Sequence, residues 1–212
     1  MTDNIIDSII FDLDGTMWDS SEQIMGTWSN VRVKYKEIRN EITIEDLKGV
    51  MGLQIKDIGK KFFPYLDEEK QMEILRYCCK SECEYLSEHG GKLYDNLEET
   101  LEKLSKTYKL FIVSNCQEGY IQAFLHAHKL DKYFVDFEYP GRTGLTKGEN
   151  IKIIMKRNNL KNPIYVGDTE GDYKAAKLAG IPFIYAKYGF GDVKEYDYKI
   201  DNLSHILDLR FH

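Results

Sequence analysis

The apolar positions of this chain form short continuous runs in some segments and recur at steps of three and four in others. The first pattern is typical of buried strands and the second of helices. A short apolar run at residues 9–11 has the length of a buried strand. The apolar positions that follow recur at steps of three and four, which predicts an amphipathic helix with Ser20 or Ser21 at its N-terminal cap. The apolar face of this predicted helix consists of Ile24, Trp28, Val31 and Tyr35.

Helical periodicity then continues without a strand. Residues 45–50, 55–63 and 67–87 each predict a helix, and the breaks between them lie near Gly49, Gly52 and Pro64. The helical stretch ends at His89-Gly90-Gly91, where the paired glycines predict a hinge. We therefore expect a helical cap domain at residues 17–89, inserted into a core domain formed by residues 1–16 and 90–212.

From residue 93 onward, helical and strand patterns alternate. Strands are predicted at residues 110–113, 134–139, 163–166 and 182–185, and helices at 97–106, 118–128, 148–157 and 172–178. This order is typical of a parallel sheet with right-handed crossovers. The predicted fold class is α/β, a doubly wound parallel sheet of the Rossmann-like kind that carries the inserted helical cap.

Charge and hydropathy narrow the possible partners. The 212 residues contain no apolar run of membrane-spanning length, and Met1-Thr2-Asp3-Asn4 lacks the features of a signal peptide, so we expect a cytoplasmic protein without a membrane partner. A net charge of −6 argues against a nucleic-acid surface, which needs clustered positive charge. A phosphorylated small molecule would need help from a metal or a lysine. The oligomeric state is left open.

The cysteines do not predict a metal or disulfide site. Their spacing fits no disulfide framework, and no histidine lies in ligand register with them. Two of them belong to an apolar helical stripe, which favours packing over chemistry. That stripe consists of Met72, Leu75, Cys79, Cys83 and Leu86.

Two carboxylates directly follow the first predicted strand. Asp12 and Asp14 are two residues apart, and Gly15 lets the chain turn, so both side chains can point into the crevice beyond the strand. In open α/β sheets ligands bind in that crevice. Asp-x-Asp-Gly is also an ordinary surface turn, because Asp and Gly favour turns for local reasons.

Polar residues follow two further predicted elements. Ser114 and Asn115 come directly after a strand, at the expected start of the next helix, where backbone N–H groups favour phosphate oxygens. Either residue would also serve as a simple helix cap. Lys147 begins a later helix, where most lysines are solvated, but an ammonium near carboxylates can hold a phosphoryl oxygen.

A second pair of carboxylates follows the strand at residues 163–166. Asp168 and Asp172 are four residues apart at a strand-to-helix turn, and such oxygen ligands suit Mg²⁺. The alternative reading makes Asp168 a cap and Asp172 a solvated charge in the first helical turn.

Taken in chain order, these elements resemble the haloacid dehalogenase superfamily of phosphohydrolases over nearly the whole length. Phe-Asp-Leu-Asp-Gly-Thr at residues 11–16, followed by Asp19-Ser20, is most similar to the phosphoglycolate phosphatase and β-phosphoglucomutase branch with a helical cap. Residues 48–53 resemble the cap loop that reaches toward substrate in that branch, which makes Gly52 and Leu53 expected substrate contacts.

The resemblance implies a division of catalytic work. Asp12 would be the nucleophile, and Asp14 would protonate the leaving oxygen and then activate water. Mg²⁺ would be held by the Asp12 side chain, the Asp14 backbone carbonyl and Asp168, with Asp172 as a supporting residue.

The resemblance also implies the phosphoryl-binding groups. Ser114, the Asn115 backbone and Lys147 would hold the phosphoryl oxygens, while Thr16 would position Asp14 and contact substrate. Two departures stand out: the segment around Lys147 lacks the family's common Gly-Lys-Pro sequence, and Cys116 occupies a position that is often polar in relatives.

The leading functional hypothesis is a magnesium-dependent phosphatase of a small phosphorylated metabolite that works through an aspartyl-phosphate intermediate. A phosphomutase is the first alternative, although no histidine lies near positions 18–24, which favours hydrolysis. A dehalogenase is disfavoured because a departing halide does not need the acid Asp14. A binding protein on the same fold is the non-enzymatic alternative.

Overall fold

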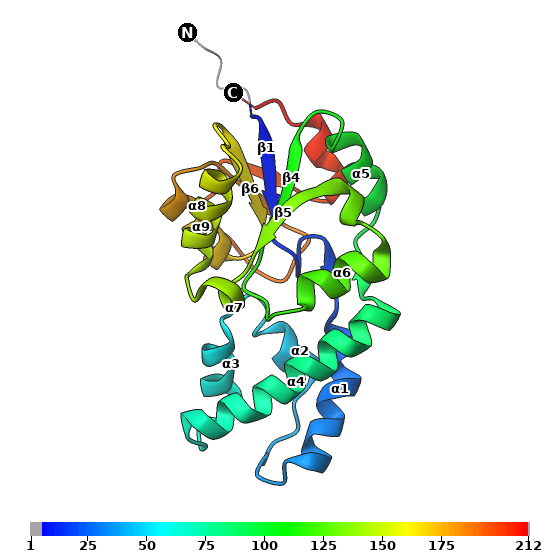
Figure 1. Ribbon diagram of the computed structural model, residues 1–212, viewed down its shortest axis with the longest axis vertical. Coiled ribbons are helices and arrows are strands. Elements are labelled where there is room, and N and C mark those ends of the chain that lie inside the picture. Colours follow the sequence, from blue (N-terminus) through cyan, green and yellow to red (C-terminus); the bar gives the residue numbers. More distant parts are fainter. Residues whose placement is uncertain (1–5, 212) are drawn as a thin grey trace.

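The computed structural model describes residues 6–211, and it has a sheet-containing core joined to a helical cap (Figure 1). The core sheet has six strands in the order β5-β4-β1-β6-β7-β8, and every neighbouring pair is parallel. The strands are β1 (Ser8–Phe11), β4 (Lys109–Val113), β5 (Phe134–Glu138), β6 (Pro163–Gly167), β7 (Phe183–Ala186) and β8 (Tyr198–Ile200). The predicted doubly wound parallel fold is confirmed.

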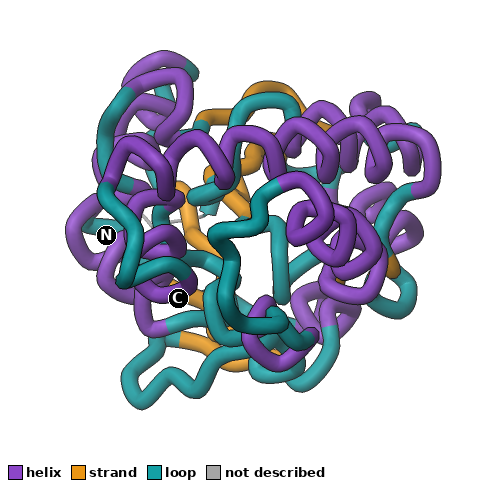
Figure 2. Tube along the Cα trace, turned by 90° about the horizontal axis from the view of Figure 1, so that it is seen from below, coloured by secondary structure: helices purple, strands orange, loops and turns teal. Residues whose placement is uncertain are grey.

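Helices cover both faces of the sheet because successive side chains of a strand point to opposite sides. Ile9 and Phe11 of β1 pack on the side of α5 (Leu97–Leu104) and α6 (Tyr120–His128). Ile10, between them, packs on the side of α8 (Lys147–Arg157) and α9 (Glu170–Ala179). Figure 2 shows the strands surrounded by helical segments.

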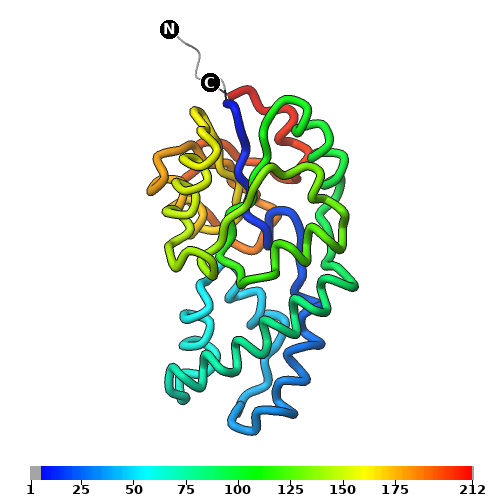
Figure 3. Tube along the Cα trace, viewed as in Figure 1, coloured from blue at the N-terminus to red at the C-terminus, as the bar shows by residue number. Residues whose placement is uncertain are grey.

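The cap consists of four helices, and the chain enters it after β1 and returns before α5 (Figure 3). They are α1 (Ser21–Lys34), α2 (Ile44–Lys48), α3 (Ile55–Phe62) and α4 (Glu68–His89). At the crossing, β2 (Trp18–Asp19) pairs antiparallel with β3 (Lys92–Leu93). Gly90, beside this pair, has a φ of +70°, a conformation that favours glycine. The domain limits at residues 16/17 and 89/90 stay predictions.

The cap packs on the core mainly through α4 against α6. At the base of this contact the Trp18 ring meets Tyr120 and Phe124 edge to face, with centroid distances of 5.5 and 5.0 Å. Trp18 is fully buried. This aromatic contact fixes the cap side of the molecule over the carboxyl ends of the strands.

Several local expectations are wrong or incomplete. The helix expected from residue 118 begins at Tyr120, after Gly119 with a φ of +87°, so Ser114 and Asn115 lie in the preceding loop and cap no helix. Ser20 occupies the N-cap position of α1, but its side chain makes no capping hydrogen bond. The elements that periodicity did not predict are β2, β3, β8, α7 (Pro140–Thr143), η1 (Asp131–Tyr133) and η2 (Leu203–Asp208).

Two observations bear on the expectations about location. Residues 1–4, on which the signal-peptide argument rested, lie outside the described residues. Within residues 6–211, no helix combines the length and the apolar character that crossing a bilayer requires.

Candidate active site

The first carboxylate is placed by the end of β1. The Asp12 N–H donates to the carbonyl of Val166 at 2.8 Å, which continues the β1–β6 pairing by one residue, and the residue as a whole is 1% exposed. The chain then turns at Gly15, which has a φ of +77°. A Cβ atom at Gly15 would overlap the Asp168 carboxylate, so only glycine fits this turn.

Lys147 lies at the first position of α8, and its ammonium group reaches two carboxylates. Nζ is 3.0 Å from Asp12 Oδ1 and 2.5 Å from Asp172 Oδ1. The N-cap Thr146 forms a capping box with Glu149, which fixes this helix start. Burial lowers the pKa of Lys147, but Asp12 and Asp172 outweigh it, and the net shift is upward. Lys147 therefore stays charged despite being 5% exposed.

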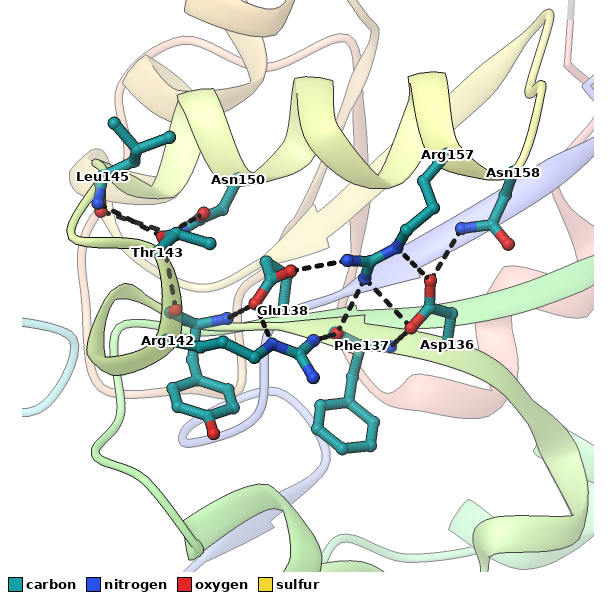
Figure 4. A network of polar contacts seen from close by, with 10 residues as sticks. Asp136, Phe137, Glu138, Arg142, Thr143, Leu145, Asn150, Arg157 and Asn158 are labelled. Atoms are coloured by element: carbon teal, nitrogen blue, oxygen red, sulfur yellow. Dashed lines mark hydrogen bonds and ion pairs between the residues drawn. The ribbon is translucent and has the colours of Figure 1, made fainter.

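The helix α8 is itself tied to the edge strand β5 by a network of polar contacts (Figure 4). Arg157, in its last turn, donates to Asp136 Oδ2 at 2.8 Å and to Glu138 Oε2 at 2.9 Å. Arg142 donates to the other oxygen of Glu138 at 2.6 Å. Because Glu138 is 1% exposed, both arginines compensate a buried charge, and the network fixes the helix that carries Lys147.

Asp168 and Asp172, after β6, have different surroundings. Asp172 accepts five hydrogen bonds: from Lys147 Nζ, from Thr169 N and Oγ1 at 2.9 and 2.6 Å, from Asp168 N at 3.2 Å and from the Tyr165 hydroxyl at 3.4 Å. Asp168 accepts one from Phe190 N at 2.7 Å through Oδ2, while its buried Oδ1 has no partner. Asp172 is therefore saturated by the protein, and Asp168 has an oxygen free for a ligand.

This arrangement fits a divalent cation. Carboxylate oxygens of Asp12, Asp168 and Asp172 lie within 4.8 Å of one another, and all three residues are buried. Burial and the neighbouring Asp172 raise the pKa of Asp12 to about 6, and the same causes raise that of Asp168. One ammonium group faces three carboxylates, so a cation at the unpartnered Asp168 oxygen would relieve the repulsion.

Asp14 has neutral hydrogen-bond donors instead of a cation. Its Oδ1 accepts from Tyr120 at 2.8 Å and from Ser20 at 3.1 Å, and these two hydroxyls are 2.6 Å apart. Desolvation is the largest cause that raises the pKa of Asp14, to about 7, and the Tyr120 hydrogen bond opposes it. At neutral pH such a carboxyl can both give and accept a proton.

Thr16 lies beside the site with its side chain fully buried. Its buried hydroxyl makes no hydrogen bond, and its main-chain carbonyl accepts from Tyr188 at 2.8 Å. The side chains that donate to Asp14 Oδ1 are those of Ser20 and Tyr120. A role of Thr16 in positioning Asp14 stays a prediction, and its side chain makes no hydrogen bond that would carry it. A contact between Thr16 and substrate stays a prediction.

The remaining expected residues line a cavity of about 840 Å³ between core and cap. Asp12, Asp14 and the pair Ser114-Asn115 lie on its core side, while Gly52 and Leu53 lie on its cap side. The Asn115 amide donates to the Gly52 carbonyl at 2.8 Å, so the cap loop is fixed directly against the predicted phosphoryl-binding segment.

Two features of the site were missed from the sequence: the contact of Tyr120 with Asp14 and the loop that contacts Asp168. Tyr120 is 106 residues from its partner Asp14, and no local pattern connects them. The Phe190 N–H comes from the loop after β7, where Gly189 approaches Asp168 so closely that a Cβ atom would overlap its carboxylate. Since β7 neighbours β6, the Gly-Phe-Gly sequence beyond its end was a usable signal.

The sequence was compared with protein families and with known proteins. The family model for haloacid dehalogenase-like hydrolases matches residues 9–186. A phosphoglycolate phosphatase of Vibrio vulnificus (strain CMCP6) is 26% identical over 234 residues, which cover 99% of this chain and 98% of the relative. The pyrophosphatase PpaX of Bacillus mycoides (strain KBAB4) is 25% identical over 221 residues, which cover 96% of each.

A solved structure extends this likeness to the arrangement in space. The crystal structure of a predicted phosphatase from Clostridium acetobutylicum matches with a TM-score of 0.80 and 26% identity. The match covers 97% of this chain and 100% of that one, so it includes both the sheet and the helical cap.

Proposed function

The chain belongs to the haloacid dehalogenase-like hydrolases and is a phosphatase, and we propose that it uses Mg²⁺ and an aspartyl-phosphate intermediate to hydrolyse a small phosphorylated metabolite. One observation carries this proposal: buried Asp12 lies 3.0 Å from Lys147 on the same cavity wall as Asp14, whose pKa is about 7. A nucleophile and a proton carrier with different surroundings are what a two-step displacement needs.

In the first step an Asp12 carboxylate oxygen attacks phosphorus, and the bond from phosphorus to the alcohol oxygen breaks. Asp14, protonated, gives its proton to that departing oxygen. In the second step Asp14 takes a proton from water, which attacks phosphorus and releases Asp12. Lys147 stays charged throughout and neutralises a phosphoryl oxygen.

Mg²⁺ would be held by Asp12, Asp168 and the Asp14 main-chain carbonyl, and it supplies charge neutralisation for an anionic substrate. Asp172 orients Lys147 and the Asp168 loop through the hydrogen bonds described above. Ser114, Asn115 and Thr16 are assigned to the phosphoryl group, and Gly52 and Leu53 to the rest of the substrate.

The partner is a small phosphorylated molecule and neither nucleic acid nor membrane. The named relatives act on phosphoglycolate and on pyrophosphate, so they support small phosphorylated substrates as a class. A cytoplasmic location and the choice of hydrolysis over phosphomutase chemistry remain predictions of the sequence.

The proposal is tested with phenyl phosphate and purified protein. We expect inorganic phosphate to be released in the presence of Mg²⁺, to cease in excess chelator, and to return when Mg²⁺ is restored. Phosphate release that continues at full rate in chelator would contradict the metal role. Transfer of the phosphoryl group to an added sugar phosphate, with no release to water, would favour the phosphomutase alternative.

A further inference from the structure

One buried acid on the cap side of the cavity has no part in the chemistry above. Glu82 of α4 is 6% exposed, and it lines the same cavity as Asp12 and Asp14. Most of the surrounding cap wall is apolar, with side chains such as Ile24, Leu47 and Leu75, and its cations Lys56, Arg76 and Lys80 are all exposed to solvent. A carboxylate at this depth is costly unless it has a function or a counter-charge.

Glu82 is held by donors from two other parts of the chain. Trp28 Nε1 of α1 donates to Oε1 at 2.5 Å, and Gln117 Nε2, from the loop after β4, donates to Oε2 at 2.6 Å. Both oxygens therefore accept, as those of an ionised carboxylate do. Among residues 6–211, no cation forms an ion pair with Glu82; Lys80, an exposed residue at the rim of the same cavity, pairs instead with Glu84 at 3.8 Å.

Glu82 and Asp14, the acid that protonates the leaving group, are linked through Tyr120. Tyr120, which donates to Asp14, has its pKa raised by burial, then by Asp14 and by Glu82, so the two carboxylates act on the same phenol. Burial also raises the pKa of Glu82 itself, against the two hydrogen bonds that lower it. Because Asp14 and Glu82 line the same cavity, a leaving group that takes its proton from Asp14 departs into the space that Glu82 also lines.

We propose that Glu82 makes the cap side of the cavity select phosphate esters whose alcohol is neutral or positively charged and donates hydrogen bonds, and reject alcohols that carry a second anion. This inference rests on the proposed function. An ammonium or hydroxyl donor would complete the solvation of the buried carboxylate, whereas a carboxylate or phosphate would be repelled in a medium of low dielectric. The chain would then differ in substrate from its relatives, whose named substrates have anionic leaving groups.

Glu82 could instead have a purely structural role, because its hydrogen bond with Gln117 joins the cap to the core. We call this role a latch, and the role in substrate choice a selector. A latch and a selector predict different substrate dependence. Loss of a latch changes kcat/KM for all substrates by a similar factor, whereas loss of a selecting charge raises the value for anionic leaving groups and lowers it for cationic ones.

The test uses a series of phenyl phosphates with a para carboxylate, hydroxymethyl or aminomethyl group, and unsubstituted phenyl phosphate as reference. The wild-type protein should prefer the aminomethyl and hydroxymethyl esters to the carboxylate. Glu82→Gln keeps the shape and can still accept from Trp28. We expect it to raise kcat/KM about tenfold for the carboxylate ester and to lower it about tenfold for the aminomethyl ester.

The matched control is Glu88→Gln, an exposed acid on the same helix, which should leave all four values within about twofold. Inhibition by inorganic phosphate should be the same in the wild type and Glu82→Gln, since phosphate needs only the core side. A uniform change across the series in Glu82→Gln would overturn the selector and leave a latch. A wild-type preference for the carboxylate ester would overturn it even if that variant fails to fold.

Failure of the proposed function gives a different result. If the wild type releases no phosphate from unsubstituted phenyl phosphate with Mg²⁺, the phosphatase assignment fails and this inference fails with it. If phenyl phosphate is hydrolysed and the charge series is flat, only the role of Glu82 fails.

Discussion

The two sides of the cavity are built in different ways. On the core side, charged groups come from strand ends and first helical turns: Asp12 after β1, Asp168 after β6 and Lys147 at the start of α8. Each has a short contact to another element, such as the 3.0 Å ion pair of Lys147 and Asp12. On the cap side, long helices present mostly apolar faces, and Glu82 is the buried acid among them.

This difference separates chemistry from selection. A parallel sheet fixes its strand ends relative to one another, so the core side holds reacting groups in one geometry whatever the substrate. Side chains on the cap helices can be substituted without disturbing that geometry. Substitutions on the core side should therefore lower kcat/KM for all substrates. Substitutions on the cap side should change which substrates are preferred.

The largest effect is expected from Asp12→Asn. The amide cannot form an acyl phosphate, so kcat/KM should fall by more than about a thousandfold for every substrate. The matched control is Asp7→Asn, just before the opposite end of β1, where Asp7 accepts from Ser8 at 2.6 Å far from the cavity. Turnover is measured as phosphate release. Near-normal turnover by Asp12→Asn would contradict the assignment of the chemistry to the core side.

Asp168→Asn should separate metal binding from folding. Activity should fall about a hundredfold, because the divalent cation loses a ligand. In chelator the variant should be more stable than the wild type, by about 2–4 °C for each kcal/mol of relieved repulsion, since one of three clustered carboxylates is neutralised. Mg²⁺ should raise the unfolding temperature of the wild type but not that of Asp168→Asn.

The exposed Asp192 supplies the control for this experiment, and Asp192→Asn should respond to Mg²⁺ as the wild type does. A Mg²⁺-dependent rise in unfolding temperature that persists in Asp168→Asn would show that the metal lies elsewhere.

Tyr120→Phe should produce an intermediate effect of about tenfold in kcat, the usual worth of a hydrogen bond to a charged group. The Tyr120 hydrogen bond lowers the pKa of Asp14, so its loss should raise that pKa above about 7. Because Asp14 must be protonated when the alcohol leaves, the decline of kcat/KM with rising pH should move to higher pH in the variant. A pH profile that does not move would mean that another group protonates the leaving oxygen.

Cys116→Ser should have the smallest effect. Cys116 lines the cavity beside Asn115, but burial, Asp14 and Asp12 all raise the pKa of its thiol, so it is a poor nucleophile at neutral pH. We expect activity, measured as phosphate release, to stay within about twofold of the wild type. A large fall in kcat would place Cys116 in the phosphoryl site.

The sequence predicted the core side well because its signals are local. An apolar strand followed by carboxylates or Ser-Asn is visible within a few residues, and a parallel sheet then brings the strand ends together. Asp12, Asp168, Asp172 and Lys147 meet in this way. The helix predicted at residues 118–128 is present as Tyr120–His128, but it begins after Gly119, in a left-handed conformation, so Ser114 and Asn115 do not lie at its start as expected.

The cap side was predicted only in outline. Met72, Leu75, Cys79 and Cys83 of the predicted apolar stripe line the cavity, and Trp28 donates from a position that the pattern assigned to packing. Periodicity identifies which face of a helix is apolar, but not whether that face meets another helix or a substrate. The contacts of Tyr120 with Asp14 and of Glu82 with Gln117 join distant segments, so no local pattern contains them.

The central claim is that Asp12 takes the phosphoryl group while Asp14 only moves protons. It is tested most directly in Asp14→Asn, which keeps the nucleophile and should react once with a phosphate ester that has a good leaving group, because such a group needs little protonation. Hydrolysis of the phosphoenzyme should then be slow. After an acid quench, mass spectrometry should find phosphate on Asp12; phosphate on another residue, or steady turnover with no phosphoenzyme, would contradict the account.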